Sequence, residues 1–392
     1  MSFLTGDSKL DFVGQRGTFA KVSSVLVAAS IIAIVLLKLN FGIDFAGGYE
    51  IQVKLPGDQS EEKIVAALKG DKISEVRAQT FGSSGDEYLI FVPEQASLSA
   101  EQKAGLKTQM NTLAGDPEKV MAWAIAESGE SFDVRFGVPV EESALRTAVE
   151  SVGVEIKDIS RGDRVDEPSY KVTLVSIADY IESTLRTKLA SEGSERIVQR
   201  IEFVGPQVGA ELRNQGILAV IYSLVFILLY IAVRFDFSFA PGAIVALVHD
   251  VLITLGVFSI FQIEFNLPVV AALLAIVGYS LNDTIVVYDR IRENIPLRRG
   301  LKLHDLVNVS LNQTLSRTVL TSGTTLLVVI ALLVLGGPMI RAFSIALLIG
   351  VIVGTYSSVA IASPVYIALR ERAMAKDDVS SKVPKKSGAV TA

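Results

Sequence analysis

Six stretches of the chain are long, apolar and nearly free of charge, and this pattern limits the fold more than any other feature. They cover residues 22–37, 214–233, 241–262, 267–288, 318–335 and 342–369. Crossing a bilayer takes about 20 apolar residues in helical form. The mean hydropathy of +0.45 agrees, while 20% charged residues require a sizeable water-exposed part. The sequence therefore predicts a polytopic α-helical membrane protein with six transmembrane helices.

Composition excludes several classes of function. The chain has no cysteine and two histidines, His249 and His304, which argues against a thiolate or zinc site. The net charge is −5, and no dense basic stripe is interleaved with aromatic residues. We expect no metal, no cofactor, no nucleic-acid partner and no enzymatic activity.

Basic residues in the short loops predict the orientation, because cytoplasmic loops carry an excess of Lys and Arg. These residues precede the first span and follow the fourth and the sixth. We therefore expect cytoplasmic tails at 1–18 and 371–392, a first span at 19–39, a periplasmic domain at 40–212, and the other five spans within 213–370. A cleaved signal peptide is the alternative for the first span, but no small-residue cleavage site precedes "LNFGIDFAGG".

The large loop alternates between strand and helix patterns. The order strand, helix, strand, strand, helix, strand occurs twice, with a period a little over 80 residues. Gly70 and Gly153 fall at matching points, as do Tyr88 and Tyr170. This predicts an α+β domain of two ferredoxin-like units in tandem, at about 43–127 and 131–206. One irregular α+β domain is the alternative.

A carboxylate inside the fourth span is the strongest candidate for function. Asp283 interrupts an apolar run, where an unpaired charge costs several kcal/mol. Tyr279 and Ser280 share a helical face with it by spacing, with Gly278 and Asn282 beside that face. The alternative is that Asp283 only hydrogen-bonds neighbouring helices, although such contacts usually involve Ser, Thr or Asn.

Asp250 and Arg317 extend this candidate site. Asp250 lies in the middle of the third span, which a short loop makes an antiparallel neighbour of the fourth, and two carboxylates in adjacent helices resemble a proton path. We take Asp250, Asn282 and Tyr279 as candidates for a secondary relay; for Asp250 a purely structural role is as well supported. Arg317 opens the fifth span at the end toward which Asp283 lies, so the two are predicted to pair. Arg317 could instead reach a lipid phosphate, and His249 is expected to pack or to form a hydrogen bond.

Two further patterns predict packing. Small residues recur every four positions along the sixth span, including Gly350, Gly354 and Ser358, and let another helix approach closely; pore lining is the lesser alternative. Residues 302–316 carry an apolar face and predict a cytoplasmic amphipathic helix on the membrane surface.

Five longer motifs resemble one known family. They are "FGIDFAGG" (41–48), "RIEFVGPQVGAEL" (200–212), "ALVHDVLITLGVFSIFQIEFNL" (246–267), "VGYSLNDTIVVYDRIREN" (277–294) and "SLNQTLSRTVLTSGTTL" (310–326). In this order they resemble the SecF family of protein-export translocase subunits, within the resistance-nodulation-division superfamily. The motifs cover almost the whole membrane core.

The resemblance implies half of a resistance-nodulation-division-type bundle in the bacterial cytoplasmic (inner) membrane. It implies a SecD-like six-span partner, the SecYEG channel and an unfolded preprotein on the periplasmic side, with the proton gradient promoting export. The family's intramembrane Asp and Arg fall by motif on Asp283 and Arg317. One departure is the loop, since the family carries one βαββαβ unit where this sequence predicts two.

Two other functions remain open. A small-molecule or lipid exporter of the superfamily would need two six-span halves, whereas this chain holds one. A structural clamp that stabilises the translocon without moving protons is the second.

Overall fold

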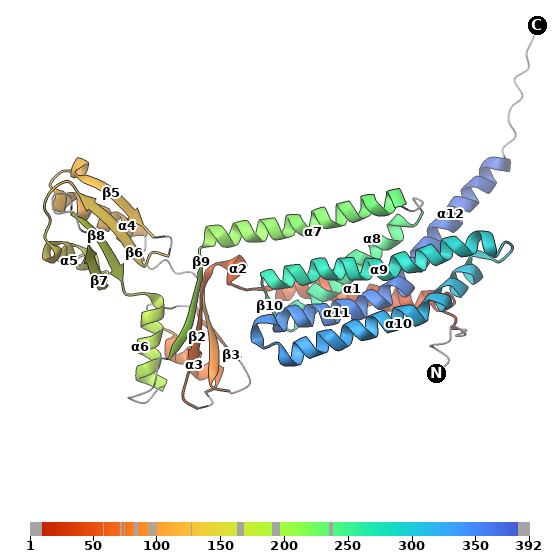
Figure 1. Ribbon diagram of the computed structural model, residues 1–392, viewed down its shortest axis with the longest axis horizontal. Helices are drawn as coiled ribbons and strands as arrows, with labels where there is room; N and C mark the ends of the chain where they lie inside the picture. Colours follow the sequence, from red (N-terminus) through yellow and green to blue (C-terminus); the bar gives the residue numbers. More distant parts are fainter. Residues whose placement is uncertain are drawn as a thin grey trace, which may run out of the picture. The chain divides into compact units, whose positions relative to one another are not determined.

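The computed structural model describes residues 10–382, apart from 58, 71, 72, 74, 82–84, 94–97, 99, 127, 163–167, 190–196 and 235–237. The chain divides into two compact units (Figure 1). One comprises Met1–Gly42 and Asn214–Ala392, and the other comprises Ile43–Arg213. The first holds the membrane-type bundle and the second holds two β-sheets.

In the described part of the chain, six helices are long and apolar enough to cross a membrane, which confirms the predicted number of spans. The first five are α1 (Arg16–Leu37), α7 (Pro206–Arg234), α8 (Ala240–Ile260), α9 (Leu267–Leu297) and α10 (Leu303–Leu335). The sixth is built from α11 (Arg341–Ser357), a π-helical segment (Ser358–Ala362) and α12 (Ser363–Lys382).

Local signals fix where α9 begins. The Asn266 side chain accepts a hydrogen bond from the Val269 amide at 3.3 Å, and Pro268 occupies the first turn. Just before it, β10 (Glu264–Phe265) pairs in parallel with β1 (Asn40–Phe41). This short pair ties the end of α1 to the loop between α8 and α9.

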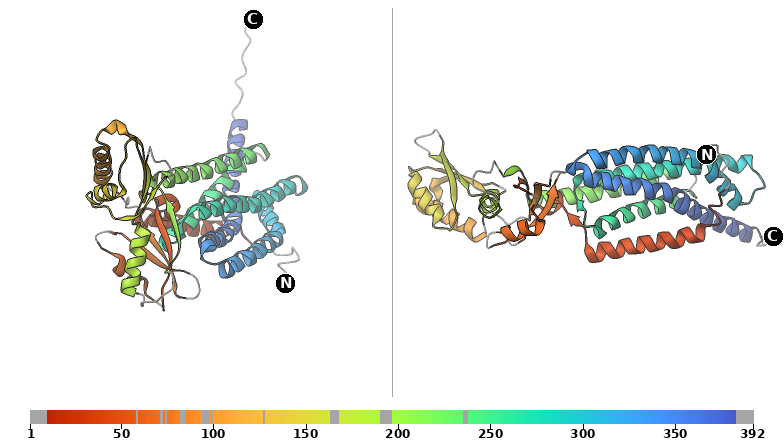
Figure 2. Two further views of the ribbon diagram at one scale, coloured as in Figure 1. Left: turned by 60° about the vertical axis from the view of Figure 1, so that its left-hand side comes forward. Right: turned by 90° about the horizontal axis from the view of Figure 1, so that it is seen from below.

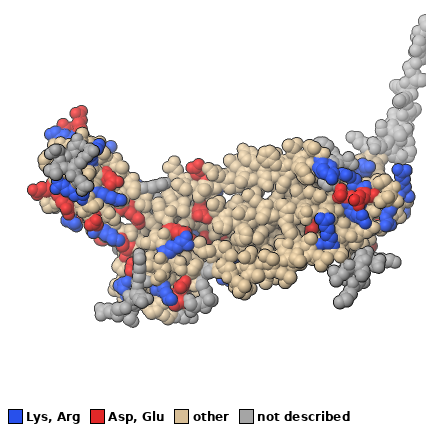
Figure 3. All heavy atoms as spheres, in the orientation of Figure 1, with Lys and Arg blue, Asp and Glu red and all other residues tan. Residues whose placement is uncertain are grey.

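The bundle buries its central helices and exposes apolar side chains outward. Helix α8 packs against α1, α9 and α11, and α10 packs against α9 and α11 (Figure 2). The outer helices expose large apolar residues, such as Phe226 at 68% and Leu335 at 83%. On the face shown in Figure 3, charged side chains gather at the ends of this unit and are absent from its middle. An apolar band of this kind matches a lipid environment.

The segment at 302–316 differs from the prediction of a surface helix. It is continuous with the fifth span in α10, and Leu306, Val307 and Leu311 are buried in the bundle core. Its polar face binds the chain before α1: Asn312 accepts from the Leu10 amide at 3.0 Å, and Asn308 accepts from the Phe12 amide at 2.9 Å. The apolar face of this segment therefore packs against protein rather than lipid. The chain before α1 covers the polar face.

The second unit contains all twelve elements that the sequence predicted. In chain order they are β2 (Gly48–Lys54), α3 (Glu61–Leu68), β3 (Arg77–Phe81), β4 (Glu87–Val92), α4 (Ala100–Ala114), β5 (Val120–Ile125), β6 (Ser131–Phe136), α5 (Glu142–Glu150), β7 (Ile156–Arg161), β8 (Ser169–Leu174), α6 (Ile177–Leu189) and β9 (Val198–Val204). A short helix, α2 (Ile43–Ala46), precedes them.

The strand pairing shows that the predicted tandem units, at 43–127 and 131–206, are wrong in their boundaries. One sheet has the order β3-β4-β2-β9, and the other has the order β5-β6-β8-β7. Strand β9 pairs antiparallel with β2, with Ile51 opposite Ile201. Helix α6 joins the same sheet, since Ala178, Ile181 and Leu185 are buried in its core. The first ferredoxin-like unit is thus β2-α3-β3-β4-α6-β9. Its βαββαβ order is interrupted after β4 by a long insertion.

The insertion forms the second sheet with α4 and α5 over a separate core. Its order, αββαββ, is the βαββαβ pattern with the first strand moved to the end, so β8 takes the central place of that strand. The two units are therefore nested. Alternation along a strand shows which face is buried but not which strand lies beside it, so the sequence could not decide between nested and tandem units.

We predict that residues 94–175 can be removed from an isolated 43–213 fragment, with Pro93 joined to Ser176 by a short Gly/Ser linker. The first sheet keeps all four strands and both helices, so cooperative thermal unfolding by circular dichroism should persist. Removal of 131–206, the predicted second unit, serves as the control and should abolish cooperative unfolding, because it takes away α6 and β9. Equal behaviour of the two deletions would contradict the nested arrangement.

Candidate functional site

The interior of the bundle is organised by close packing of α9 against α11. A methyl group at Gly350 would overlap the Ile276 side chain, and one at Gly354 would lie 2.9 Å from Cβ of Ser280. Ser358 is fully buried in the π-helical segment that follows. The small residues of the sixth span therefore face α9 of the same chain, at the level where α9 carries its polar side chains.

Asp283 lies on α9 and is 2% exposed. Its Oδ2 atom makes no hydrogen bond to any described part of the protein. The groups near enough to interact with the carboxylate are the Arg317 guanidinium and the Ser322 hydroxyl, both on α10. Arg317 is exposed, and the described residues show no direct ion pair between it and Asp283. The carboxylate is thus enclosed by the bundle with a cation nearby on the next helix.

A chain of hydroxyl groups adjoins Asp283. Tyr279, one turn earlier on α9, donates to the Ser322 hydroxyl at 3.0 Å. Ser322 and Thr355 of α11 lie 2.7 Å apart, oxygen to oxygen. These bonds join α9, α10 and α11 beside the carboxylate.

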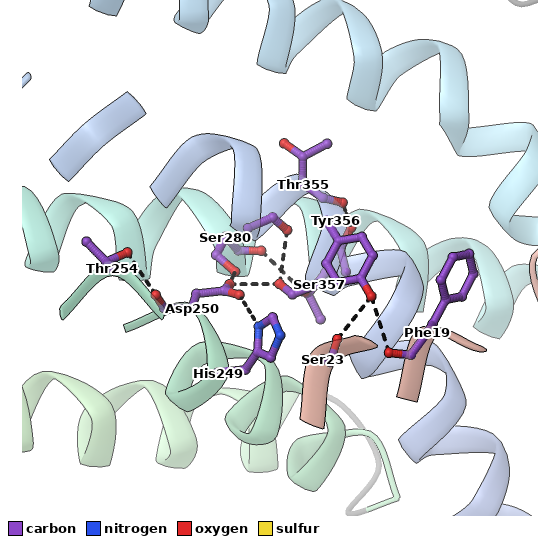
Figure 4. Close-up of polar contacts among 12 residues, drawn as sticks. Phe19, Ser23, His249, Asp250, Thr254, Ser280, Thr355, Tyr356 and Ser357 are labelled. Atoms are coloured by element: carbon purple, nitrogen blue, oxygen red, sulfur yellow. Dashed lines mark hydrogen bonds and ion pairs between the residues drawn. The ribbon is translucent and has the colours of Figure 1, made fainter. Parts of the chain in front are cut away.

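Asp250 forms a second polar cluster, shown in Figure 4. It is fully buried on α8. Its Oδ1 lies 2.9 Å from Nδ1 of His249, and its Oδ2 accepts hydrogen bonds from Ser280 of α9 at 2.5 Å and Ser357 of α11 at 2.7 Å. A buried carboxylate needs such partners, and here they come from three helices.

The π-helical segment begins immediately after Ser357. A π-turn leaves some backbone carbonyls without the usual α-helical partner. Two side chains bind carbonyls there: Ser363 donates to Ser358 at 3.1 Å, and Tyr288 of α9 donates to Ala362 at 3.0 Å. The wider turn is therefore held by hydroxyl groups next to the Asp250 cluster.

The structure brings together only part of the predicted site. Tyr279 and Asp283 both face α10, whereas Ser280, predicted on the same face, turns toward α8 and binds Asp250. Asn282 is exposed and contacts neither cluster. At 3.6 residues per turn, Ser280 lies about 100° from Tyr279 and about 60° from Asp283, and this rotation turns it toward α8.

His249 forms a hydrogen bond, which is one of the two roles predicted for it. It is 5% exposed, and its partner, which the sequence did not predict, is the Asp250 carboxylate. The available signal was its position: His249 precedes Asp250 inside an apolar span, and adjacent titratable residues there carry a high cost. Ser357 had no such signal, because only the packing of α11 on α8 brings it to Asp250.

Comparisons with known proteins agree on one family. Residues 184–372 match the family described as "Protein export membrane protein SecD/SecF, C-terminal", and residues 32–55 match "SecD/SecF GG Motif". "Protein translocase subunit SecF" of Koribacter versatilis is 38% identical over 382 residues, covering 93% of each chain. The protein of that name from Vibrio alginolyticus is 39% identical over 348 residues, covering 88% of this chain and 85% of its own.

A solved structure is also similar. The crystal structure of SecDF from Thermus thermophilus, described as a translocon-associated membrane protein, aligns with a TM-score of 0.66 and 31% identity. The alignment covers 94% of this chain and 39% of the SecDF chain. This chain thus spans about two fifths of the SecDF chain that it resembles.

We predict that Gly350→Ala destabilises the bundle by about 1–3 kcal/mol, the usual range for overpacking, because the added methyl group overlaps Ile276. Gly278→Ala on α9 is the matched control: nothing lies within 4 Å of the added atom, so it should be neutral or slightly stabilising. Thermal unfolding of both variants in mild detergent measures the difference. Equal melting temperatures would contradict the tight contact between α9 and α11.

Proposed function

This chain belongs to the SecF family of protein-translocase subunits, and from that premise we propose that it uses the proton gradient to promote preprotein export across the cytoplasmic membrane. In this proposal it works with a SecD-like six-span subunit beside the SecYEG channel. It holds the preprotein on the periplasmic side through the 43–213 unit and lies within membrane lipid.

The basic residues support this orientation. Arg290, Arg292, Arg298, Arg299 and Lys302 lie between the fourth and fifth spans. The opposite short loops contain Arg341 as their basic residue. By the positive-inside rule both ends of the bundle sequence are cytoplasmic, and the 43–213 unit is periplasmic.

The observation that carries the proton coupling is the enclosed carboxylate of Asp283. It is 2% exposed in a membrane-type helix, one oxygen has no hydrogen-bond partner among the described residues, and the Arg317 charge is nearby. Carboxylates in such surroundings commonly exchange protons in pumps and transporters. A group that gains and loses a proton changes its attraction to Arg317, which can move α9 relative to α10.

Helices α7 and α10 offer an outer surface that lipid or another membrane protein can cover, since 11% and 17% of the residues in their spans are buried. The similar SecDF chain is more than twice as long, and repeat-built transporters place their ion sites near the interface of two halves. We propose that a SecD-like subunit supplies the second half.

We predict that Asp283→Asn inserts and folds normally but loses most gradient-dependent export, because the amide has the size of the carboxylate and cannot carry a proton. Export into energised inverted vesicles, with and without an uncoupler, measures this. Arg317→Ala should be similarly defective, whereas Arg317→Lys should keep part of the activity because the charge persists.

Asn282→Asp is the matched control, since it moves a carboxylate by one residue to an exposed position. In the Asp283→Asn background it should not restore export. If Asp283→Asn alone exported normally in response to the gradient, the proton role of Asp283 would be rejected. Export that the uncoupler leaves unchanged in the wild-type protein would instead indicate a structural clamp.

We further predict that the chain co-purifies in mild detergent with a six-span SecD-like protein at a fixed ratio. Mass spectrometry of the tagged complex identifies the partner, and a strain lacking that protein is the control. Purification of this chain as an isolated, stable monomer that moves protons unaided would contradict the half-bundle argument.

A further inference from the structure

The Asp250 cluster contains a second titratable pair that the Asp283 proposal does not use. His249 and Asp250 are 5% and 0% exposed, and the ring nitrogen Nδ1 contacts carboxylate oxygen Oδ1. No described lysine or arginine forms an ion pair with Asp250. The pair must therefore balance its own charge through the position of its protons.

The hydroxyl groups around Asp250 suit both protonation states of the carboxylate. With Asp250 ionised, Ser357 donates its single proton to Oδ2 across 2.7 Å. With the proton on Oδ1, where it arrives from Nδ1 of His249, Oδ2 can still accept from Ser280, and the Ser357 proton can turn to the Gly354 carbonyl at 3.1 Å. A hydroxyl can act as donor and acceptor, so one side-chain rotation satisfies either state without breaking the contact between α8 and α11.

A line of polar groups leads away from the pair toward the start of α1. The Nε2 atom of His249 is buried and has no hydrogen-bond partner in the described protein. The His249 ring lies 6.2 Å from the Tyr356 ring, centre to centre. The Tyr356 hydroxyl lies 3.0 Å from the Ser23 hydroxyl and 3.3 Å from the Phe19 carbonyl, both on α1 (Figure 4).

We propose that His249 and Asp250 form a second proton-binding site of the bundle, which exchanges protons past Tyr356 with the end of the bundle where α1 begins. The proton moves between Nδ1 of His249 and the Asp250 carboxylate, while Nε2 gives or takes the proton that enters or leaves. The coupling of this site to export rests on the proposed function, but proton binding itself does not.

The surroundings restrict which other groups affect the pair. Helix α11 contributes Tyr356, and α1 contributes the neutral Ser23. Helix α9 contributes Ser280 to the pair and carries Asp283 and Tyr288 elsewhere on its surface. Tyr288 donates to Ala362, and its ring lies 6.0 Å from the tilted ring of Tyr366 of α12. Of these groups, Asp283 is the other acid.

The test relies on the chain having two histidines, His249 and His304. In the His304→Gln variant, labelling with ¹⁵N-histidine leaves the His249 ring as the one labelled histidine, so its protonation and tautomer can be followed by NMR in nanodiscs as pH is varied. We expect the His249 ring signals to change with pH. Asp250→Asn should shift the pH midpoint of that change, because the imidazolium loses its counter-charge.

Ser357→Ala and Ser344→Ala form a matched pair of buried serine substitutions on α11. Ser357→Ala removes a donor to the carboxylate and should shift the midpoint measurably. Ser344 binds the Ile340 carbonyl instead and lies 13 residues away, so Ser344→Ala should leave the midpoint unchanged. A His249 signal that does not change between about pH 5 and 9, or that changes identically in Asp250→Asn, would overturn the proposal.

Export measurements separate this inference from the proposed function. If both hold, Asp250→Asn should reduce gradient-dependent export while retaining the wild-type melting temperature. Normal export by Asp283→Asn with an Asp250-dependent His249 signal would reject the proposed role of Asp283 alone. Defective export by Asp283→Asn with a His249 titration insensitive to Asp250 would reject the second site alone.

Discussion

The close contact between α9 and α11 is the interaction on which the rest of the bundle depends. Gly350 and Gly354 remove the side-chain volume that would otherwise hold the helices apart, so Ile276 and Ser280 sit directly against the α11 backbone. In a bilayer, helix association depends on packing and on polar contacts, because lipid chains are as apolar as the side chains themselves. The same approach brings Ser280 and Ser357 to one oxygen of Asp250. Gly350 and Gly354 thus allow both the close packing of α9 on α11 and the hydrogen bonding of Asp250.

Two carboxylates in this bundle have different surroundings. Asp250 has its hydrogen-bond capacity met by His249, Ser280 and Ser357, while Asp283 has an unbonded oxygen and a cation on the next helix. Both lie close to α11, which carries Thr355 toward the Asp283 side and Ser357 toward Asp250. The π-helical segment begins at the next residue, and π-turns are frequent at functional sites. Helix α11 therefore contacts both polar clusters, through Thr355 and Ser357.

The 43–213 unit shows which features of a fold local sequence patterns can predict and which they cannot. Its strands and helices followed from alternation and helical spacing, because burial on one face imposes a period on the side chains. The pairing partner of each strand could not be predicted, since by pattern alone either β5 or β9 could pair with an edge of β2. The apolar face of α6, with Ile181 and Leu185, fits the core of the first sheet across an insertion of about 80 residues. Such pairing is a property of the three-dimensional arrangement of the chain.

The sequence by itself determined the six spans and the twelve elements of the 43–213 unit, and it marked Asp283 as a candidate site residue, because hydrophobic length, periodicity and an isolated charge in an apolar run are local properties. It also indicated Arg317 through charge placement. Only the tertiary structure decided that the sheets are nested, that Ser280 serves Asp250 rather than Asp283, that Asn282 is exposed, and that His249 holds the Asp250 carboxylate. The physical reason is that a residue's partner depends on the rotation and depth of packed helices and on the pairing of distant strands, and no short stretch of sequence carries that information.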